Sequence, residues 1–345
     1  MTNHILFLGI IAFGLCIALV PLMITLGKKW NIMDMPSERK IHTKALPRTG
    51  GFALVLTAIT VLLLNHFFHL SSPSIFFKIL PSLLIIIIIG IYDDTKGSNA
   101  ILKFSFQILA SVLLYFNGLS IDRISNPLGG YFVFSGWVSF FITIFWTVGL
   151  INAINLLDGM DGLATGIILI SSIFIFIIAL FSHNTLIIFL SLLMIAITSG
   201  FLVFNFPPAK IFMGDTGSMF LGFMMASIGI LGNRKSAVSI TLLFPIILLI
   251  IPIFDTFLAI VRRVVTKKNI FRADKNHIHH RFLSLGISQR KTLWFIYGFN
   301  IYLGFLALLS LILSHSYFFV LLVVLLVSFF LGIEFLRFFE KKNKH

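Results

Sequence analysis

Long apolar stretches alternate with short polar segments along the whole chain. A helix needs about 20 apolar residues to cross the hydrocarbon core of a bilayer, and eleven stretches reach or approach that length. This pattern predicts an all-α integral membrane protein, one polytopic domain over residues 1–345, with about eleven transmembrane helices. The expected spans are 5–26, 50–68, 76–92, 100–118, 134–152, 163–182, 184–204, 216–232, 237–261, 292–313 and 317–338.

The composition excludes several soluble classes. Hydrophobic residues make up 58% of the 345 residues and charged residues 11%, whereas soluble proteins carry about 25% charged residues. The single cysteine, Cys16, lies in an apolar run and cannot form an intrachain disulfide. The net charge of +14 indicates basic cytoplasmic loops rather than nucleic-acid binding.

The basic residues predict the orientation. With the N-terminus outside and the C-terminus in the cytoplasm, all 26 Lys and Arg except four fall on the cytoplasmic side. The four exceptions are Lys78, Arg123, Arg234 and Lys235. Of the 12 acidic residues, only Asp122 falls outside. We therefore expect an active site on the cytoplasmic face of a bacterial cytoplasmic membrane. It would be built from segments 27–49, 93–99, 153–162, 205–217 and 262–291.

Two adjacent carboxylates, Asp93 and Asp94, end the third predicted span. Neighbouring carboxylates at the lipid boundary repel each other and resist dehydration. A charged helix terminus is one explanation. The alternative is a carboxylate pair that binds a cation or acts as a general base.

Four polar residues, Asn152, Asn155, Asp158 and Asp161, recur every three residues before the sixth predicted span. On a helix this spacing would form one polar stripe. Their oxygen atoms suit a hard cation such as Mg²⁺ and the donors of a nucleotide. The alternative is a polar helix end that caps its neighbours.

In segment 205–217, Asp215 precedes small and hydroxyl residues that can begin a helix, and Lys210 lies five residues earlier. A phosphate could bind at such a helix N-terminus, with a metal ion bridging it to Asp215. Asp215 could also be a capping residue alone.

The longest basic segment contains His277, His279, His280 and Arg281. No thiol is nearby, and the histidines lack the i, i+4 spacing of a helical zinc pair. Phosphate recognition therefore fits better than zinc, with contact to anionic lipids as a further alternative.

Two other signals are weaker. Arg39 and Lys40, together with the basic residue beside the glycine pair at 50–51, could contact a phosphate. Asp255 lies within the ninth predicted span and should face the bundle interior, where it could pair with Arg262 or Arg263. Oxygen ligands and basic residues on one membrane face together indicate metal-dependent phosphoryl transfer to or from a membrane lipid.

The sequence resembles the polyprenyl-phosphate N-acetylhexosamine-1-phosphate transferase family through six motifs in the family's order. They are Asp-x-Pro-x-x-Arg-Lys-x-His at 34–42, Pro-x-x-Gly-Gly at 47–51, Asp93–Asp94, the segment 152–163, Pro-Ala-Lys-x-Phe-Met-Gly-Asp at 208–215 and His-Ile-His-His at 277–280.

Within that family, the histidine segment followed by Arg281 resembles one branch of the enzymes. That branch transfers N-acetylglucosamine-1-phosphate from UDP-N-acetylglucosamine to undecaprenyl phosphate. The products are undecaprenyl-diphospho-N-acetylglucosamine and UMP, in the first membrane step of an O-antigen, common-antigen or teichoic-acid linkage unit. The alternative donor is another UDP-N-acetylhexosamine, including UDP-N-acetylmuramoyl-pentapeptide, whose enzymes typically carry three consecutive histidines.

The resemblance also implies a role for each matching residue. Asp93 and Asp94 would be catalytic, either deprotonating the lipid phosphate or attacking the β-phosphate. Mg²⁺, with Mn²⁺ as a substitute, would bind Asp215, Asn155 and Asp158. Asp161 and Phe212 would contact uracil, and Asp255 and Asn152 would support the site. The phosphate or sugar of the donor would be contacted by His277, His279, His280, Arg281 and Lys210. The phosphate of the lipid would be contacted by Lys103, Arg39 and Lys40.

Two competing classes fit less well. A transporter would bury its charges near the bilayer midplane between broken helices. A CDP-alcohol phosphotransferase needs Ala-Arg and two further Asp after its Asp-Gly motif, whereas Leu163, Ala164 and Thr165 follow Gly162. The expected partners are the two substrates and membrane lipids, without nucleic acid, and a homodimer is one possible assembly.

Overall fold

The structure is a computed structural model, and almost all of the chain that it describes is helical. It describes residues 2–36, 45–68, 74–125, 130–235, 243–265, 267, 278–312, 323–324 and 327–328. The helices are α1 (Thr2–Lys29), α2 (Gly50–Phe67), α3 (Ser74–Lys96), α4 (Ala100–Phe116), α5 (Gly136–Leu157), α6 (Leu163–Phe181), α7 (Thr185–Asn205), α8 (Gly214–Lys235), α9 (Leu243–Leu248), α10 (Ile250–Val265), α11 (Ile278–Ser284) and α12 (Gln289–Ile312). Two antiparallel ribbons, β1 (Met33–Asp34) with β2 (Leu46–Pro47) and β3 (Arg123–Ser125) with β4 (Tyr131–Val133), complete the fold.

Eight of these helices are long and apolar enough to cross a membrane, namely α1, α2, α3, α5, α6, α7, α8 and α12. They correspond to eight of the eleven predicted spans. The predicted span 100–118 forms α4, which is apolar but shorter. The predicted span 317–338 lies largely outside the described residues, so the total of eleven stays a prediction.

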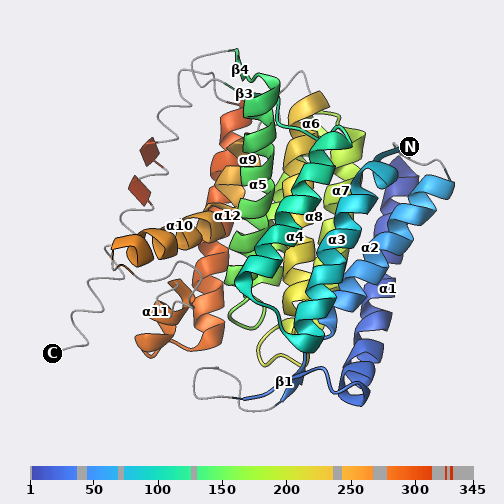
Figure 1. Cartoon of the computed structure of the whole chain (residues 1–345), viewed down its shortest axis with the longest axis vertical. Coiled ribbons are helices and arrows are strands. Elements are labelled where there is room, and N and C mark those ends of the chain that lie inside the picture. The colour runs from blue at the N-terminus through green and yellow to red at the C-terminus, as the bar shows by residue number, and fades with distance from the viewer. Residues whose placement is uncertain are drawn as a thin grey trace.

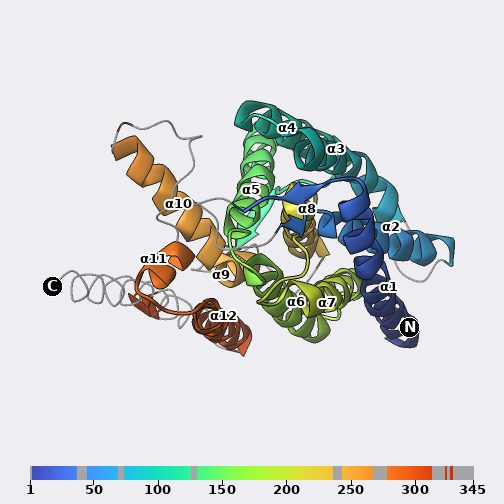
Figure 2. The same cartoon turned by 90° about the horizontal axis from the view of Figure 1, so that it is seen from below.

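The prediction that the ninth span, 237–261, is one continuous helix is wrong. The described part divides into α9 and α10, with a break at Leu249. Pro252 has no backbone N–H and cannot donate to the carbonyl four residues earlier, so it is tolerated in the first turn of a new helix. After the break, α10 projects sideways from the bundle, across the direction of the long helices (Figures 1 and 2).

Helix α8 lies near the centre of the bundle, among α5, α3, α2 and α7 (Figure 2). Almost all residues of its apolar stretch are buried, and it packs against α5, α3 and α2. A side chain at Gly90 or Gly51 would collide with the backbone of Thr216 or Gly217. Glycine at both positions therefore allows the first turn of α8 to approach α3 and α2 closely.

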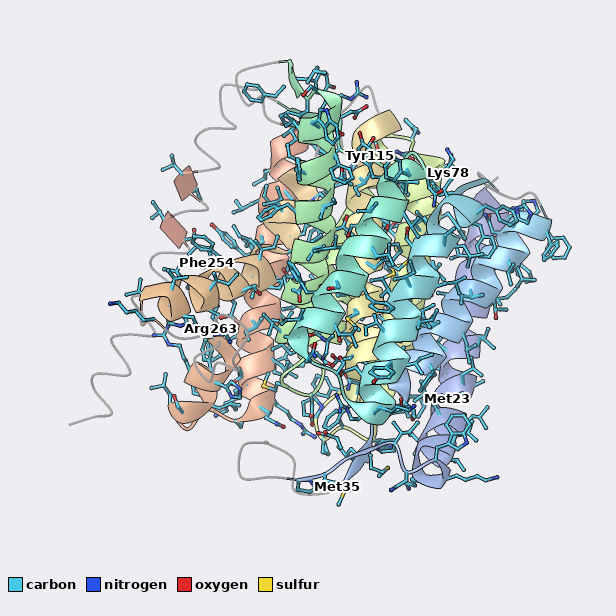
Figure 3. The ribbon with its side chains drawn as sticks, viewed as in Figure 1. Met23, Met35, Lys78, Tyr115, Phe254 and Arg263 are labelled. Atoms are coloured by element: carbon cyan, nitrogen blue, oxygen red, sulfur yellow. The ribbon has the colours of Figure 1, made fainter. Side chains whose placement is uncertain are left out.

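Because successive helices run in opposite directions, several loops meet at one end of the bundle. The β1–β2 ribbon, the α3–α4 turn and loops 158–162 and 206–213 lie at the lower end in Figure 1. Met35 marks this end in Figure 3, whereas Lys78 and Tyr115 lie at the opposite end. The fold thus brings together segments that the sequence predicts on one face. The orientation of that face in a membrane stays a prediction.

Candidate active site

Three carboxylates meet at the lower end of the bundle. Asp93 and Asp94 lie near the end of α3, and Asp215 lies in the first turn of α8. One oxygen of each lies within 4.8 Å of the others, and among the described residues no other group of three His, Cys, Asp or Glu is as compact. Asp93 and Asp94 are only 8% and 7% exposed. Three oxygen donors at this spacing could hold a hard cation such as Mg²⁺.

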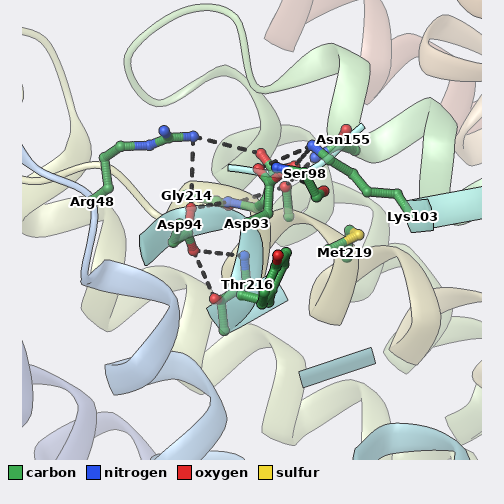
Figure 4. Close-up of polar contacts among 12 residues, drawn as sticks. Arg48, Asp93, Asp94, Ser98, Lys103, Asn155, Gly214, Thr216 and Met219 are labelled. Atoms are coloured by element: carbon green, nitrogen blue, oxygen red, sulfur yellow. Dashed lines mark hydrogen bonds and ion pairs between the residues drawn. The ribbon is translucent and has the colours of Figure 1, made fainter. Parts of the chain in front are cut away.

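A lysine from α4 bridges two of these carboxylates. The Nζ atom of Lys103 lies 3.0 Å from Oδ2 of Asp93 and forms a second, shorter ion pair with Oδ2 of Asp215. Asn99 caps α4 by accepting the N–H of Leu102, which fixes the helix turn that carries Lys103. The structure therefore places the predicted lipid-phosphate residue beside the predicted catalytic pair (Figure 4).

An arginine that was not among the predicted site residues completes the cluster. Arg48 follows β2, and its guanidinium lies 3.6 Å from Oδ1 of Asp94 and 3.7 Å from Oδ1 of Asp215. Burial lowers the pKa of Arg48, but Asp94, Asp215 and Asp34 outweigh that effect, so its pKa is raised and it stays charged. The sequence signals for Arg48 were its place in the Pro-x-x-Gly-Gly motif and its position beside a glycine pair, where a basic residue could contact a phosphate.

The two adjacent aspartates have different environments. Asp94 accepts the N–H of Asp215 at 2.8 Å through Oδ1, and the N–H and hydroxyl of Thr216 at 2.9 and 2.6 Å through Oδ2. Its carboxylate therefore caps α8. This corrects the prediction of a phosphate at that helix N-terminus, because Asp94 already satisfies those N–H groups.

Asp93 is held from one side and faces Lys103 on the other. Its Oδ1 atom accepts the N–H and the hydroxyl of Ser98 at 2.9 and 2.6 Å. Its Oδ2 atom faces Lys103. Of the pair, Asp93 is thus the carboxylate that faces Lys103, whereas Asp94 caps α8 and faces Arg48.

The prediction of one helical polar stripe from Asn152 to Asp161 is wrong for Asp158 and Asp161. Helix α5 ends at Leu157, so only Asn152 and Asn155 lie on it. Asn152 donates to Oε1 of Gln107 at 2.6 Å, and Asn155 donates to Oγ of Ser218 at 2.8 Å. Asn155 therefore connects the end of α5 to the first turns of α8.

Asp158 comes directly after α5, outside the compact carboxylate group. Burial raises its pKa well above the ordinary range, and the negative charge of Asp215 raises it further, while Arg48 opposes both. Asp158 is therefore electrostatically coupled to the cluster, where a bound cation would favour its charged form.

The two residues predicted to contact uracil lie on adjacent loops. Oδ2 of Asp161 accepts the backbone N–H of Ala209 at 3.0 Å. Phe212 is partly exposed, and its N–H donates to the carbonyl of Pro47 at 2.8 Å. Lys210, on the same loop as Phe212, is exposed.

The histidine segment is described only in part. Arg39, Lys40 and His277 lie outside the described residues, as does the side chain of His279. His280 and Arg281 lie partly buried on α11. The first residue of that helix, Ile278, donates its N–H to Oδ1 of Asp255, which is 4% exposed, so Asp255 anchors α11.

Comparison with known proteins identifies the family. Residues 76–233 match the family described as Glycosyl transferase family 4. Over 298 residues the chain is 39% identical to the probable undecaprenyl-phosphate N-acetylglucosaminyl 1-phosphate transferase of Bacillus subtilis (strain 168), covering 86% of this chain and 81% of that protein. The chain belongs to glycosyl transferase family 4. The predicted resemblance to polyprenyl-phosphate N-acetylhexosamine-1-phosphate transferases, which are membrane enzymes of this family, is confirmed.

Other relatives of this family 4 transferase differ in their named substrates. The decaprenyl-phosphate N-acetylglucosaminephosphotransferase of Mycobacterium leprae (strain TN) is 35% identical, over 79% of this chain and 75% of that protein. A phospho-N-acetylmuramoyl-pentapeptide-transferase of Streptococcus agalactiae serotype III (strain NEM316) is 33% identical, over 83% and 90% of the two chains. Family membership therefore leaves the sugar donor to be assigned.

Proposed function

We propose that the protein transfers N-acetylglucosamine-1-phosphate from UDP-N-acetylglucosamine to undecaprenyl phosphate. The products are undecaprenyl-diphospho-N-acetylglucosamine and UMP, at the start of a cell-envelope polysaccharide. The observation that carries the proposal is the cluster of Asp93, Asp94 and Asp215 with Lys103 and Arg48 at one end of a membrane-type bundle. We further propose that this end faces the cytoplasm, because the basic loops predict that orientation.

The proposed reaction is a displacement at the β-phosphorus of the donor. An oxygen of the acceptor phosphate forms a new P–O bond, the bond from the β-phosphorus to the bridging oxygen breaks, and UMP leaves with the electron pair. Phosphoryl transfer depends mainly on positioning and charge stabilisation. Lys103 would bind the acceptor phosphate, and Asp93, 3.0 Å from Lys103, would take its proton if the phosphate arrives protonated.

The oxygen donors around Asp215 fit Mg²⁺, because they are carboxylate and amide oxygens without thiols. Asp215, together with Asn155 and Asp158, would hold the ion. A bound Mg²⁺ would neutralise the diphosphate and stabilise the charge on the departing UMP. The chain's own residues would position the donor. Asp161 and Phe212 would contact the uracil, and its sugar-phosphate would be contacted by His279, His280 and Arg281.

N-acetylglucosamine is proposed over N-acetylmuramoyl-pentapeptide for two reasons. Ile278 interrupts the histidine run and Arg281 follows it. In addition, the relative at 39% identity is named for N-acetylglucosamine, whereas the one named for the pentapeptide is at 33%. The pentapeptide donor remains the second candidate, because that relative also covers most of this chain.

The test is UMP release by the purified protein in detergent, with undecaprenyl phosphate, Mg²⁺ and one nucleotide sugar at a time. We expect release with UDP-N-acetylglucosamine and its loss on addition of EDTA. Release only with another UDP-sugar would keep the reaction and overturn the donor assignment. No release with any donor, from protein shown to be folded, would overturn the proposed activity.

A further inference from the structure

A single buried side chain, Asn205, connects the two loops that carry Asp161 and Phe212. Asn205 is the last residue of α7 and is 1% exposed. Loop 158–162 follows α5, whereas loop 206–213 follows α7. The relative position of Asp161 and Phe212 therefore depends on what joins these loops.

The Asn205 amide contacts both loops directly. Its Oδ1 atom accepts the backbone N–H of Gly162 at 3.1 Å and the hydroxyl of Thr165 at 2.9 Å. Its Nδ2 atom donates to the carbonyl of Ile211 at 3.0 Å. All of these groups are buried, and buried backbone groups without partners are costly. Removing the amide would thus leave the Gly162 N–H and the Ile211 carbonyl without this partner and remove one direct connection between the loops.

The bonded groups belong to the peptide units next to the two nucleotide-site residues. The N–H of Gly162 is part of the peptide unit that follows Asp161. The carbonyl of Ile211 is part of the peptide unit that precedes Phe212. Asn205 therefore holds these two peptide units at a fixed separation.

Other bonds also hold these two loops. The hydroxyl of Tyr297 donates to the carbonyl of Gly162, whose φ of +73° favours glycine. Asp161 accepts the N–H of Ala209, and Arg290 donates to the carbonyl of Pro207 at 3.1 Å. Asn205 is the member of this network whose side chain reaches both peptide units.

We propose that Asn205 is a positioning residue for the donor nucleotide, because it sets the spacing between Asp161 and Phe212. This inference rests on the proposed function, in which those two residues contact uracil. The acceptor side is built from Asp93 and Lys103, on α3 and α4, which are separate from the Asn205 bonds. Loss of Asn205 should therefore weaken nucleotide binding selectively.

The test compares wild type, Asn205→Leu and Asn184→Leu in detergent. Asn184 caps the opposite end of the same helix by accepting the N–H of Ile187 at 3.3 Å, so it is a matched control for loss of an α7 cap. For Asn205→Leu we expect UDP affinity by calorimetry, and the KM for the donor, to worsen about tenfold. The acceptor KM and kcat at saturating donor should stay within about twofold of wild type. Asn184→Leu should leave UDP affinity unchanged.

Asn205→Asp provides a second variant if the leucine variant does not fold. It keeps an oxygen for Gly162 but cannot donate to Ile211, so a smaller loss of UDP affinity is expected. Unchanged UDP affinity in both folded variants, or equal losses for donor and acceptor, would overturn the positioning role alone. A wild-type protein that binds no uridine nucleotide would overturn the proposed donor site and this role with it.

Discussion

Asp94 accepts both the backbone N–H and the hydroxyl of Thr216, 122 residues further along the chain. The side chain of Asp94 is fully buried, and the same carboxylate also accepts the N–H of Asp215. One aspartate of the adjacent pair therefore fixes the start of the central helix and, with it, the position of Asp215. The other, Asp93, keeps an oxygen facing Lys103. The pair thus combines a helix cap with a group placed for chemistry.

Replacing Thr216 with Val should lower stability but preserve much of the activity. The change removes the hydroxyl bond to Asp94 and leaves the N–H bond in place, at a cost of about 1 kcal/mol. Thr216→Ser keeps the hydroxyl and is the matched control. Thermal unfolding in detergent, measured together with UMP release, checks this; equal melting temperatures for the two variants would contradict the capping role.

Replacing Asp93 with Asn should reduce kcat by at least about 100-fold, because the amide cannot accept a proton from the acceptor phosphate. Melting temperature and UDP affinity should stay near wild type, since Asn can still accept from Ser98. Asp122→Asn, which alters an acidic residue predicted on the other side of the membrane, is the control and should retain activity. Near-wild-type turnover by Asp93→Asn would remove the catalytic assignment.

Whether Asp93 acts as a base or as a nucleophile can be tested by UMP release in the absence of undecaprenyl phosphate. If Asp93 acts as a base, UDP-N-acetylglucosamine alone should release no UMP. A burst of UMP equal to the amount of enzyme, measured by rapid quench, would instead indicate a covalent intermediate on the carboxylate.

Replacing Lys103 with Gln should raise the KM for undecaprenyl phosphate at least about tenfold, because the cation that would bind its phosphate is lost. The same change should tighten Mn²⁺ binding, measured by electron paramagnetic resonance, since Lys103 competes for Asp93 and Asp215. Lys96→Gln is the control: Lys96 is exposed on α3 and lies over the ring of Tyr92. Unchanged values for Lys103→Gln would argue against the acceptor site.

Asp158 should make the protein less stable as pH rises. Its pKa is raised well above the ordinary value of about 4, first by burial and then by Asp215, so the folded state holds this proton more tightly than the unfolded state. The stabilisation is therefore present below pH about 4 and is lost as pH rises through the folded pKa. Asp158→Asn should raise the melting temperature relative to wild type at neutral pH and not near pH 4. Added Mg²⁺ should reduce that difference; an equal difference at both pH values would contradict the assignment.

The sequence alone predicted most of the bundle, because membrane spans are a local property of apolar runs. The eight long spans fall where the hydrophobic pattern places them. The alternation of spans also predicted that Asp93, Asp94 and Asp215 share one end. The six ordered motifs were sufficient for the family, since short patterns in a fixed order need no tertiary information.

Only the tertiary structure decided how these parts meet. It separated the roles of Asp93 and Asp94, added Arg48 to the cluster and divided the predicted ninth span at Leu249. It also placed Asn205 between Asp161 and Phe212. Hydropathy reports whether a segment prefers lipid to water, and that preference belongs to the segment itself. A hydrogen bond between residues 122 apart depends on how closely two helices pack, and the local pattern of neither helix contains that distance.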